Sequence, residues 1–122
     1  MLIYVSHSTS FNFRDELYKP LRESELAGSH QFIFPHDSSD NQFPTKKLFL
    51  DKVCDLVLAE VSFPSTGQGI ELGWADNAGI RIVCVYKETV KFSVSLKAVS
   101  KELVAYKNTD ELIQKLSQIL NQ

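Results

Sequence analysis

The sequence has few of the features that mark several large classes of protein. Its 122 residues include only two cysteines, Cys54 and Cys84, and both lie in apolar stretches. We therefore expect two buried free thiols in a reducing compartment, with a disulfide between them as the alternative. The net charge is −2, so the chain lacks the basic excess of a nucleic-acid-binding surface.

Long hydrophobic runs are also missing. No apolar run approaches the length that crosses a bilayer, and residues 1–5 lack the basic start and long apolar region of a signal peptide. The three histidines, His7, His30 and His36, have no metal-ligand spacing with each other or with the cysteines. The sequence therefore predicts a cytoplasmic protein with no metal, no membrane contact and no nucleic-acid partner.

Short apolar runs alternate with amphipathic segments along the whole chain. The runs are of strand length and lack polar alternation, and they lie at 2–5, 31–34, 56–61, 81–86 and 103–106. The segments with helical spacing lie at 13–27, where Pro20 predicts a kink or two shorter helices, and at 46–53, 68–77 and 108–120. Residues 88–99 fit neither pattern.

Strands that are apolar on both faces and alternate with helices are typical of a covered parallel sheet. The sequence therefore predicts one α/β domain over residues 1–122, a doubly wound, flavodoxin-like parallel sheet of about five strands with helices on both faces. Ligands bind such sheets beyond the carboxyl ends of the strands. We expect the loops at 6–10, 35–45, 62–69 and 87–95 to meet there.

Residues 55–75 combine an apolar strand, a turn of small residues from Ser65 to Gly69, and a new helix. Such a turn can hold a phosphate with backbone amides at a helix N-terminus. The alternative is a plain strand-to-helix turn whose glycines satisfy its backbone angles. The turn matches neither a P-loop nor the three-glycine dinucleotide fingerprint, and local residues leave both interpretations open.

Glu71 lies in the first turn of the helix predicted after this turn. A glutamate in a first turn is usually there because the helix dipole stabilises it. At the ligand end of the sheet it could instead attack an electrophilic carbon or act as a base. Tyr4 lies in the first strand and Ser8 in the loop that follows it. Tyr4 could be an ordinary core residue and Ser8 an ordinary loop hydroxyl, or both could contact the ligand.

The whole motif resembles one family. The residues that carry the likeness are Asp55-Leu-Val-Leu-Ala-Glu-Val-Ser62, then Pro64-Ser65, Gly67, Gly69, Glu71-Leu72-Gly73 and Ala75. They resemble the nucleoside 2-deoxyribosyltransferase family, and within it the 2′-deoxynucleoside 5′-monophosphate N-glycosidases. Tyr4 with Ser8, residues 79–86, and Val94-Ser95 extend the likeness, whereas residues 11–50 match poorly.

The resemblance implies a role for each matching residue. Glu71 would be the nucleophile at the anomeric carbon, as in retaining glycoside cleavage, and Tyr4 would orient it or the sugar. The 5′-phosphate would be held by Ser65 and the amides of Gly67 and Gly69, and Ser8 would also lie near it. Ser95 would reach the phosphate site of a partner subunit in a homodimer. The implied ligand is a small nucleoside or nucleotide, with no cofactor.

Two positions depart from the family pattern. Lys47 stands eight residues before Asp55, where the family has an aspartate that handles the leaving base. A lysine can donate a hydrogen bond to the base but cannot replace a carboxylic acid at neutral pH. Three nearby acids are candidate substitutes: Asp37, Asp40 and Asp51. His7 stands where close relatives tend to have glycine, at the sugar-phosphate end.

Three functions remain open at this point. The leading one is an N-glycosidase or deoxyribosyltransferase acting through Glu71. The second, favoured by Lys47, is a nucleotide-binding module of the same fold that has lost its chemistry. The third is a hydrolase of a ribosylated nucleotide such as NAD, to which no particular residue points.

Overall fold

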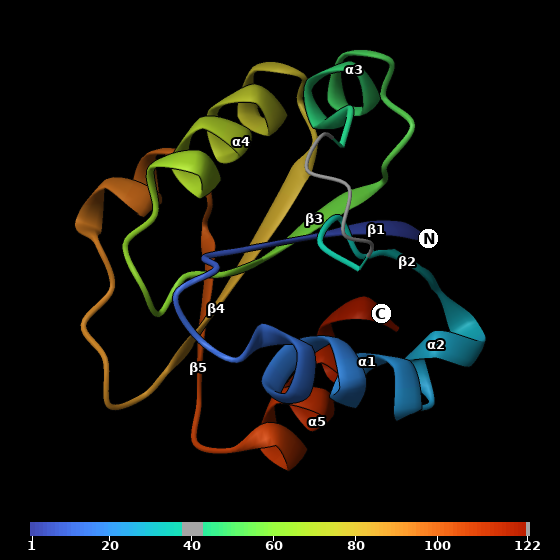
Figure 1. Ribbon diagram of the computed structural model, residues 1–122, viewed down its shortest axis with the longest axis vertical. Helices are drawn as coiled ribbons and strands as arrows, with labels where there is room; N and C mark the ends of the chain where they lie inside the picture. The colour runs from blue at the N-terminus through green and yellow to red at the C-terminus, as the bar shows by residue number, and fades with distance from the viewer. Residues whose placement is uncertain (38–42, 122) are drawn as a thin grey trace.

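The computed structural model describes residues 1–37 and 43–121. Five parallel strands form a sheet in the order β2-β1-β3-β4-β5 (Figure 1). This is the flavodoxin-like order, and it confirms the predicted fold class. The strands are β1 (Leu2–His7), β2 (Gln31–Ile33), β3 (Leu56–Glu60), β4 (Arg81–Lys87) and β5 (Glu102–Tyr106).

Helices cover both faces of this sheet (Figure 1). One face is covered by α1 (Lys19–Glu23), α2 (Leu26–Ser29) and α5 (Thr109–Leu120). The other is covered by α3 (Thr45–Leu50) and α4 (Thr66–Asn77). Two short turns complete the fold: η1, a π-helical turn at Arg14–Tyr18, and η2, a 3-10 turn at Val94–Ala98 inside the stretch that the sequence left unassigned.

Local residues explain where the helices begin and end. Pro20 lies in the first turn of α1, and the segment 13–27 divides into η1, α1 and α2 as Pro20 predicted. Gly79 follows α4 with φ of 74°, a backbone angle that favours glycine. Asn108 caps α5, and its Oδ1 accepts a hydrogen bond from the amide of Glu111 at 2.9 Å.

Alternation along β1 divides its side chains between the two cores. Ile3 and Val5 pack in the cluster with α1, α2 and α5, whereas Tyr4 packs in the cluster with α3 and α4. Ser6 follows Tyr4 on its face, and His7 follows Val5. At the carboxyl edge of the sheet, where the parallel strands end, Ser6 therefore lies on the face of Tyr4 and His7 lies on the opposite face.

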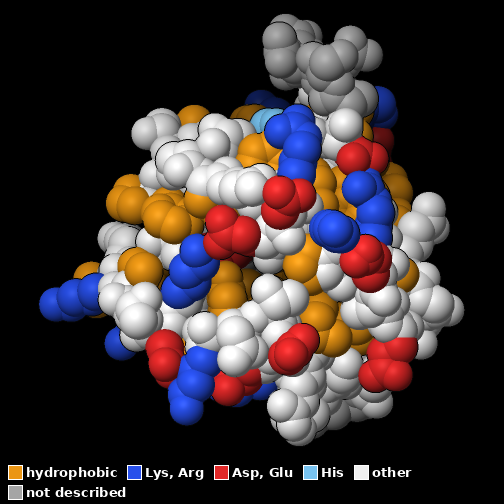
Figure 2. Space-filling view, turned by 60° about the horizontal axis from the view of Figure 1, so that its bottom comes forward, with side chains coloured by type: hydrophobic (Ala, Val, Ile, Leu, Met, Phe, Trp, Pro, Cys, Tyr) orange, Lys and Arg blue, Asp and Glu red, His pale blue; other side chains and the backbone are white. Residues whose placement is uncertain are grey.

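The surface and the cysteines agree with an ordinary globular chain. Figure 2 shows acidic and basic side chains interspersed over the face that carries α1 and α5. Cys54 and Cys84 are buried free thiols, as predicted, and burial raises the pKa of Cys84 to about 11. None of the helices in the described ranges combines the length and hydropathy needed to span a bilayer.

Candidate active site

Glu71 is the carboxylate around which the candidate site is built. It lies one turn into α4 and is half-buried. The Tyr4 hydroxyl donates to its Oε2 at 2.7 Å, and the Ser6 hydroxyl donates to its Oε1 at 2.9 Å. Both oxygens of one carboxylate are thus fixed by hydroxyls of β1, so its position and orientation are set by the sheet.

A third hydroxyl, that of Thr45, completes the hydrogen bonds of Tyr4. The Tyr4 oxygen lies 2.8 Å from Oγ1 of Thr45, at the start of α3. Because Tyr4 gives its only proton to Glu71, Thr45 must donate to Tyr4. The Tyr4 ring is fully buried and packs edge-on against Phe49 at 5.0 Å between centroids. Burial, together with the charge of Glu71, raises the pKa of Tyr4 above its ordinary value, so Tyr4 stays a proton donor.

This arrangement can present a carboxylate to an electrophilic carbon. Hydrogen bonds from neutral hydroxyls hold the oxygens without placing a positive charge beside them, so the carboxylate keeps its nucleophilic character. Glu71 is half-buried, so part of its side chain stays in contact with solvent. The geometry therefore distinguishes Glu71 from a simple first-turn acid, which would need no partners on a neighbouring strand.

The turn before α4 forms a second part of the site. Ser65 caps α4, and its Oγ accepts from the amide of Gln68 at 3.2 Å. A Cβ at Gly67 or Gly69 would meet nothing within 4 Å, so there is free space beside both glycines, although the Gly69 amide itself donates to the Ser65 carbonyl at 3.0 Å. A cavity of about 320 Å³ borders the turn, and its lining includes Ser65, Gly69 and Ser95 of the same chain.

The cavity and Glu71 lie on different sides of α4. Gln68, Gly69, Leu72 and Gly73 line the cavity, whereas Glu71 contacts β1. The structure thus brings the predicted phosphate ligands Ser65, Gly69 and Ser95 to one cavity, and brings Tyr4 to Glu71.

Ser8 and His7 are neighbours in the chain but contact different groups. Ser8 is buried at the end of β1, and its Oγ lies 2.7 Å from Oγ of Ser10. His7 lies on the opposite face of the sheet from Tyr4 and Ser6, with its ring 4.4 Å from that of Phe13. The structure does not bring His7 together with Glu71.

Hydrogen bonds and burial make His7 a neutral imidazole. Its Nδ1 lies 2.8 Å from the carbonyl of Ser8, so Nδ1 carries the proton, and its Nε2 accepts from the Tyr18 hydroxyl at 2.6 Å. The Tyr18 oxygen in turn accepts from the amide of His36 at 3.1 Å. Burial lowers the pKa of His7 to about 4, and the nearby His36 and Arg14 act in the same direction.

Lys47 points away from the site. Its side chain is 77% exposed and pairs with Asp51 at 2.6 Å. Asp37 pairs with Arg22 at 2.6 Å, and Asp40 lies outside the described residues. The hydroxyl that α3 places beside the Tyr4 hydroxyl is that of Thr45, two residues before Lys47.

Two contacts of the site were missed in the sequence, Ser6 and Thr45. Ser6 could have been found, because it lies two residues after Tyr4 in a strand and therefore shares its face. Thr45 had a weaker signal: it starts an apolar set with Leu48 and Phe49 at helical spacing, which identifies the inward face of α3. In the described part of the chain, no group of three or more His, Cys, Asp or Glu side chains could hold a metal ion.

The fold and the site define a class: a flavodoxin-like α/β protein with a hydroxyl-held glutamate beside the carboxyl edge of its sheet. The chain is similar in structure to the CMP N-glycosidase BcmB of Clostridium botulinum, with a TM-score of 0.66 over 96% of this chain and 99% of that chain. The two sequences are 23% identical, so the likeness is one of fold. It agrees with the resemblance that the 55–75 motif carries. No protein-family model and no curated protein matches the chain.

Proposed function

We propose that this protein cleaves the N-glycosidic bond of a 2′-deoxyribonucleoside or its 5′-monophosphate, or transfers its sugar, with Glu71 as the nucleophile. The observation that carries the proposal is the pair of hydroxyl contacts, Tyr4 at 2.7 Å and Ser6 at 2.9 Å, on the two oxygens of Glu71. The fold shared with a CMP N-glycosidase supports it, as does the family resemblance of the motif.

The chemistry follows the retaining pattern of glycoside cleavage. A Glu71 oxygen bonds to the anomeric carbon as the bond from that carbon to the base nitrogen breaks, and the bonding electrons leave with the base. Water, or a second base, then attacks the anomeric carbon, the bond from that carbon to Glu71 breaks, and the proton lost by the attacking group goes to the departed base. Tyr4 and Ser6 keep the carboxylate aimed through both steps, and Thr45 keeps the Tyr4 proton directed at Glu71.

The 5′-phosphate is assigned to the turn before α4. Ser65 and Gly67 lie at the positive end of a 12-residue helix. Gly69 follows in the first turn, where its amide donates to the Ser65 carbonyl and leaves open space beside its Cα. Ser8 directly follows the strand β1. In the proposed homodimer, which the family resemblance implies, Ser95 of each chain would also reach the phosphate site of the other, in addition to lining the cavity beside its own chain's turn. Light scattering at micromolar concentration tests the dimer, and a monomer would remove this role of Ser95.

The direct test is release of free base from the four deoxynucleoside monophosphates, from CMP and from the matching nucleosides. Glu71→Ala should lower the rate by roughly a thousandfold or more, as expected for loss of a nucleophile. Asp76→Ala, an exposed acid on the same helix, is the matched control and should leave the rate unchanged. Release that is equal in wild type and Glu71→Ala would refute the proposal. Mass spectrometry of acid-quenched enzyme should show the sugar on Glu71.

A second candidate function is a nucleotide-binding module without turnover. It is favoured by the outward position of Lys47 and by the ion pairs that occupy Asp37 and Asp51. Among the described residues, no carboxylic acid other than Glu71 contacts Tyr4, Ser6 or Thr45. Calorimetric binding of a nucleotide without any base release would favour this function, and turnover in the same sample would exclude it.

A further inference from the structure

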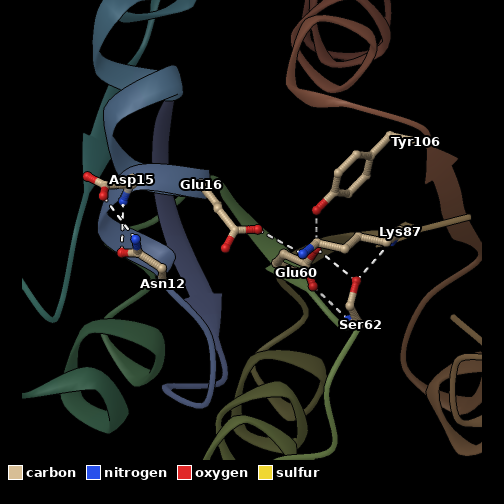
Figure 3. Close-up of polar contacts among 7 residues, drawn as sticks. All are labelled: Asn12, Asp15, Glu16, Glu60, Ser62, Lys87 and Tyr106. Carbon is tan, nitrogen blue, oxygen red and sulfur yellow. Dashed lines mark hydrogen bonds and ion pairs between the residues drawn. The ribbon is translucent and has the colours of Figure 1, made fainter. Parts of the chain in front are cut away.

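A second carboxylate, Glu60, lies at the carboxyl edge of the sheet on the face opposite Glu71. It is the last residue of β3 and is 1% exposed. In the described part of the chain it belongs to no ion pair, because the nearby Lys87 ammonium pairs with Glu16 at 2.8 Å (Figure 3). A buried carboxylate without a cation is costly unless donors satisfy it.

Three donors on two neighbouring segments satisfy the Glu60 carboxylate. Its Oε1 accepts from the amide of Ser62 at 2.6 Å, and its Oε2 accepts from the Ser62 hydroxyl at 2.9 Å and from the Tyr106 hydroxyl (Figure 3). Every partner is a donor, which suits an ionised carboxylate. Burial and Glu60 together raise the pKa of Tyr106 above its ordinary value, so Tyr106 keeps its proton. We call Glu60, Ser62 and Tyr106 the Glu60 clasp.

The Glu60 clasp holds both ends of the turn that begins α4. At the near end, Ser62 is fixed by the carboxylate, and its Oγ also accepts from the amide of Lys87 at 2.8 Å. At the far end, the Gln68 side chain donates to the backbone carbonyl of Glu60 at 2.8 Å, while the Gln68 amide donates to Ser65. One residue of β3 thus fixes residues 62–68, and Ser65 and Gly67 lie between the two fixed points.

We propose that the Glu60 clasp positions this turn for an anionic group of the ligand, so that Glu60 and Tyr106 act on binding from the opposite face of the sheet without touching the ligand. This proposal rests on the proposed function, because it takes the ligand's phosphate to bind at Ser65 and the amides of the turn. A clasp that only stabilised the fold would lower stability when broken and would weaken all ligands alike. A positioning clasp weakens the phosphate contacts selectively.

Tyr106→Phe is the sharpest variant, because it removes one hydroxyl and keeps the ring in the core. Tyr86→Phe is the matched control, since Tyr86 is a half-buried tyrosine at the end of β4 that packs against Phe92 instead. Calorimetry compares the affinity for a deoxynucleoside monophosphate with that for its nucleoside. In Tyr106→Phe the preference for the phosphorylated ligand should fall roughly tenfold, the scale on which remote misplacement of a binding group acts. Glu60→Gln should do the same, and Tyr86→Phe should not.

Amide hydrogen exchange tests the clasp without any ligand. In Tyr106→Phe, exchange across residues 62–69 should speed up roughly tenfold relative to wild type, with β1 and the rest of α4 unchanged. Unchanged exchange in residues 62–69 would overturn the proposal, whatever the nucleotide results. An unchanged phosphate preference alongside faster exchange would reduce the clasp to a structural role and overturn it as well. If wild type showed no phosphate preference while exchange responded as expected, the proposed phosphate site would fail, and with it the binding part of this proposal.

Discussion

Replacing His7 with glutamine should remove much of the loss of stability that this protein undergoes on mild acidification. His7 is 5% exposed, accepts from Tyr18 and donates to the Ser8 carbonyl. Burial holds its pKa at about 4, below the ordinary value of 6.5. Between these values the unfolded chain binds a proton at His7 that the folded chain does not. Stability is therefore complete above pH 6.5 and falls as the pH decreases toward 4.

The size of the effect follows from the two pKa values. The gap between 6.5 and about 4 is worth about 3 kcal/mol of unfolding free energy once the pH is below both. At about pH 5 the loss is already about 2 kcal/mol, a large fraction of the stability of a small domain. Glutamine cannot titrate, yet it offers one donor and one acceptor to the partners of His7.

Urea denaturation at about pH 7.5 and about pH 5 measures this contribution. The fall in unfolding free energy between the two pH values should be about 2 kcal/mol smaller in His7→Gln than in wild type. Titrating groups that do not interact with His7 contribute equally to both proteins, so the difference reports on His7 and its coupling to His36. His36→Gln, whose ring is exposed and lies 5.2 Å from that of His7, is the comparison and should reduce the loss far less than His7→Gln, because burial is the main cause of the low His7 pKa and His36 only a lesser one. Equal losses in His7→Gln and wild type would show that His7 is not held neutral.

Three further substitutions test other parts of the structure. Gly79→Ala should lower the unfolding free energy by about 1 kcal/mol, because φ of 74° strains an L residue while its Cβ would meet nothing within 4 Å; thermal denaturation measures this, and an unchanged midpoint would contradict it. Asn108→Ala should cost about 1 kcal/mol through loss of the α5 cap, and Asn108→Asp should restore most of it in the same assay. Thr45→Val should slow base release roughly fivefold, because Tyr4 loses the hydrogen bond from Thr45 that directs its proton at Glu71. Ligand affinity should be retained, and a rate equal to that of wild type would show that Thr45 has no part in the site.

The fold could be predicted from the sequence because its signals are local. The apolar runs that became the five strands lack polar alternation, and only a sheet covered on both faces buries such runs. Pro20 and Gly79 mark helix boundaries through backbone geometry alone. Strand order follows largely from the short connections and right-handed crossovers that parallel strands require.

The site was harder to predict because it depends on distances through space. Tyr4 and Glu71 are 67 positions apart and meet only when α4 packs over β1. Counting back from Asp55 selected Lys47, but the count fixes a position along the chain and not the face of a helix. α3 turns Thr45 and Phe49 inward and Lys47 outward, as a repeat of 3.6 residues per turn requires. A helical projection of α3 would have given Thr45.

The two faces of the sheet differ in the burial of their polar groups at the carboxyl edge. On the face of α3 and α4, the Tyr4 and Ser6 hydroxyls bind a half-buried glutamate, and the Thr45 hydroxyl binds Tyr4. On the opposite face, the groups of His7 and of the Glu60 clasp are buried and hydrogen-bonded. Because adjacent residues of a strand point to opposite faces, a shift of one position in β1 would exchange Ser6 and His7. The register that pairs His7 with Glu60 across β1 and β3 therefore also places Ser6 under Glu71. The buried hydrogen bonds of His7 and the Glu60 clasp fix the ends of the strands. Because β1 is fixed in this way, Tyr4 and Ser6 are held in position to bind the Glu71 carboxylate.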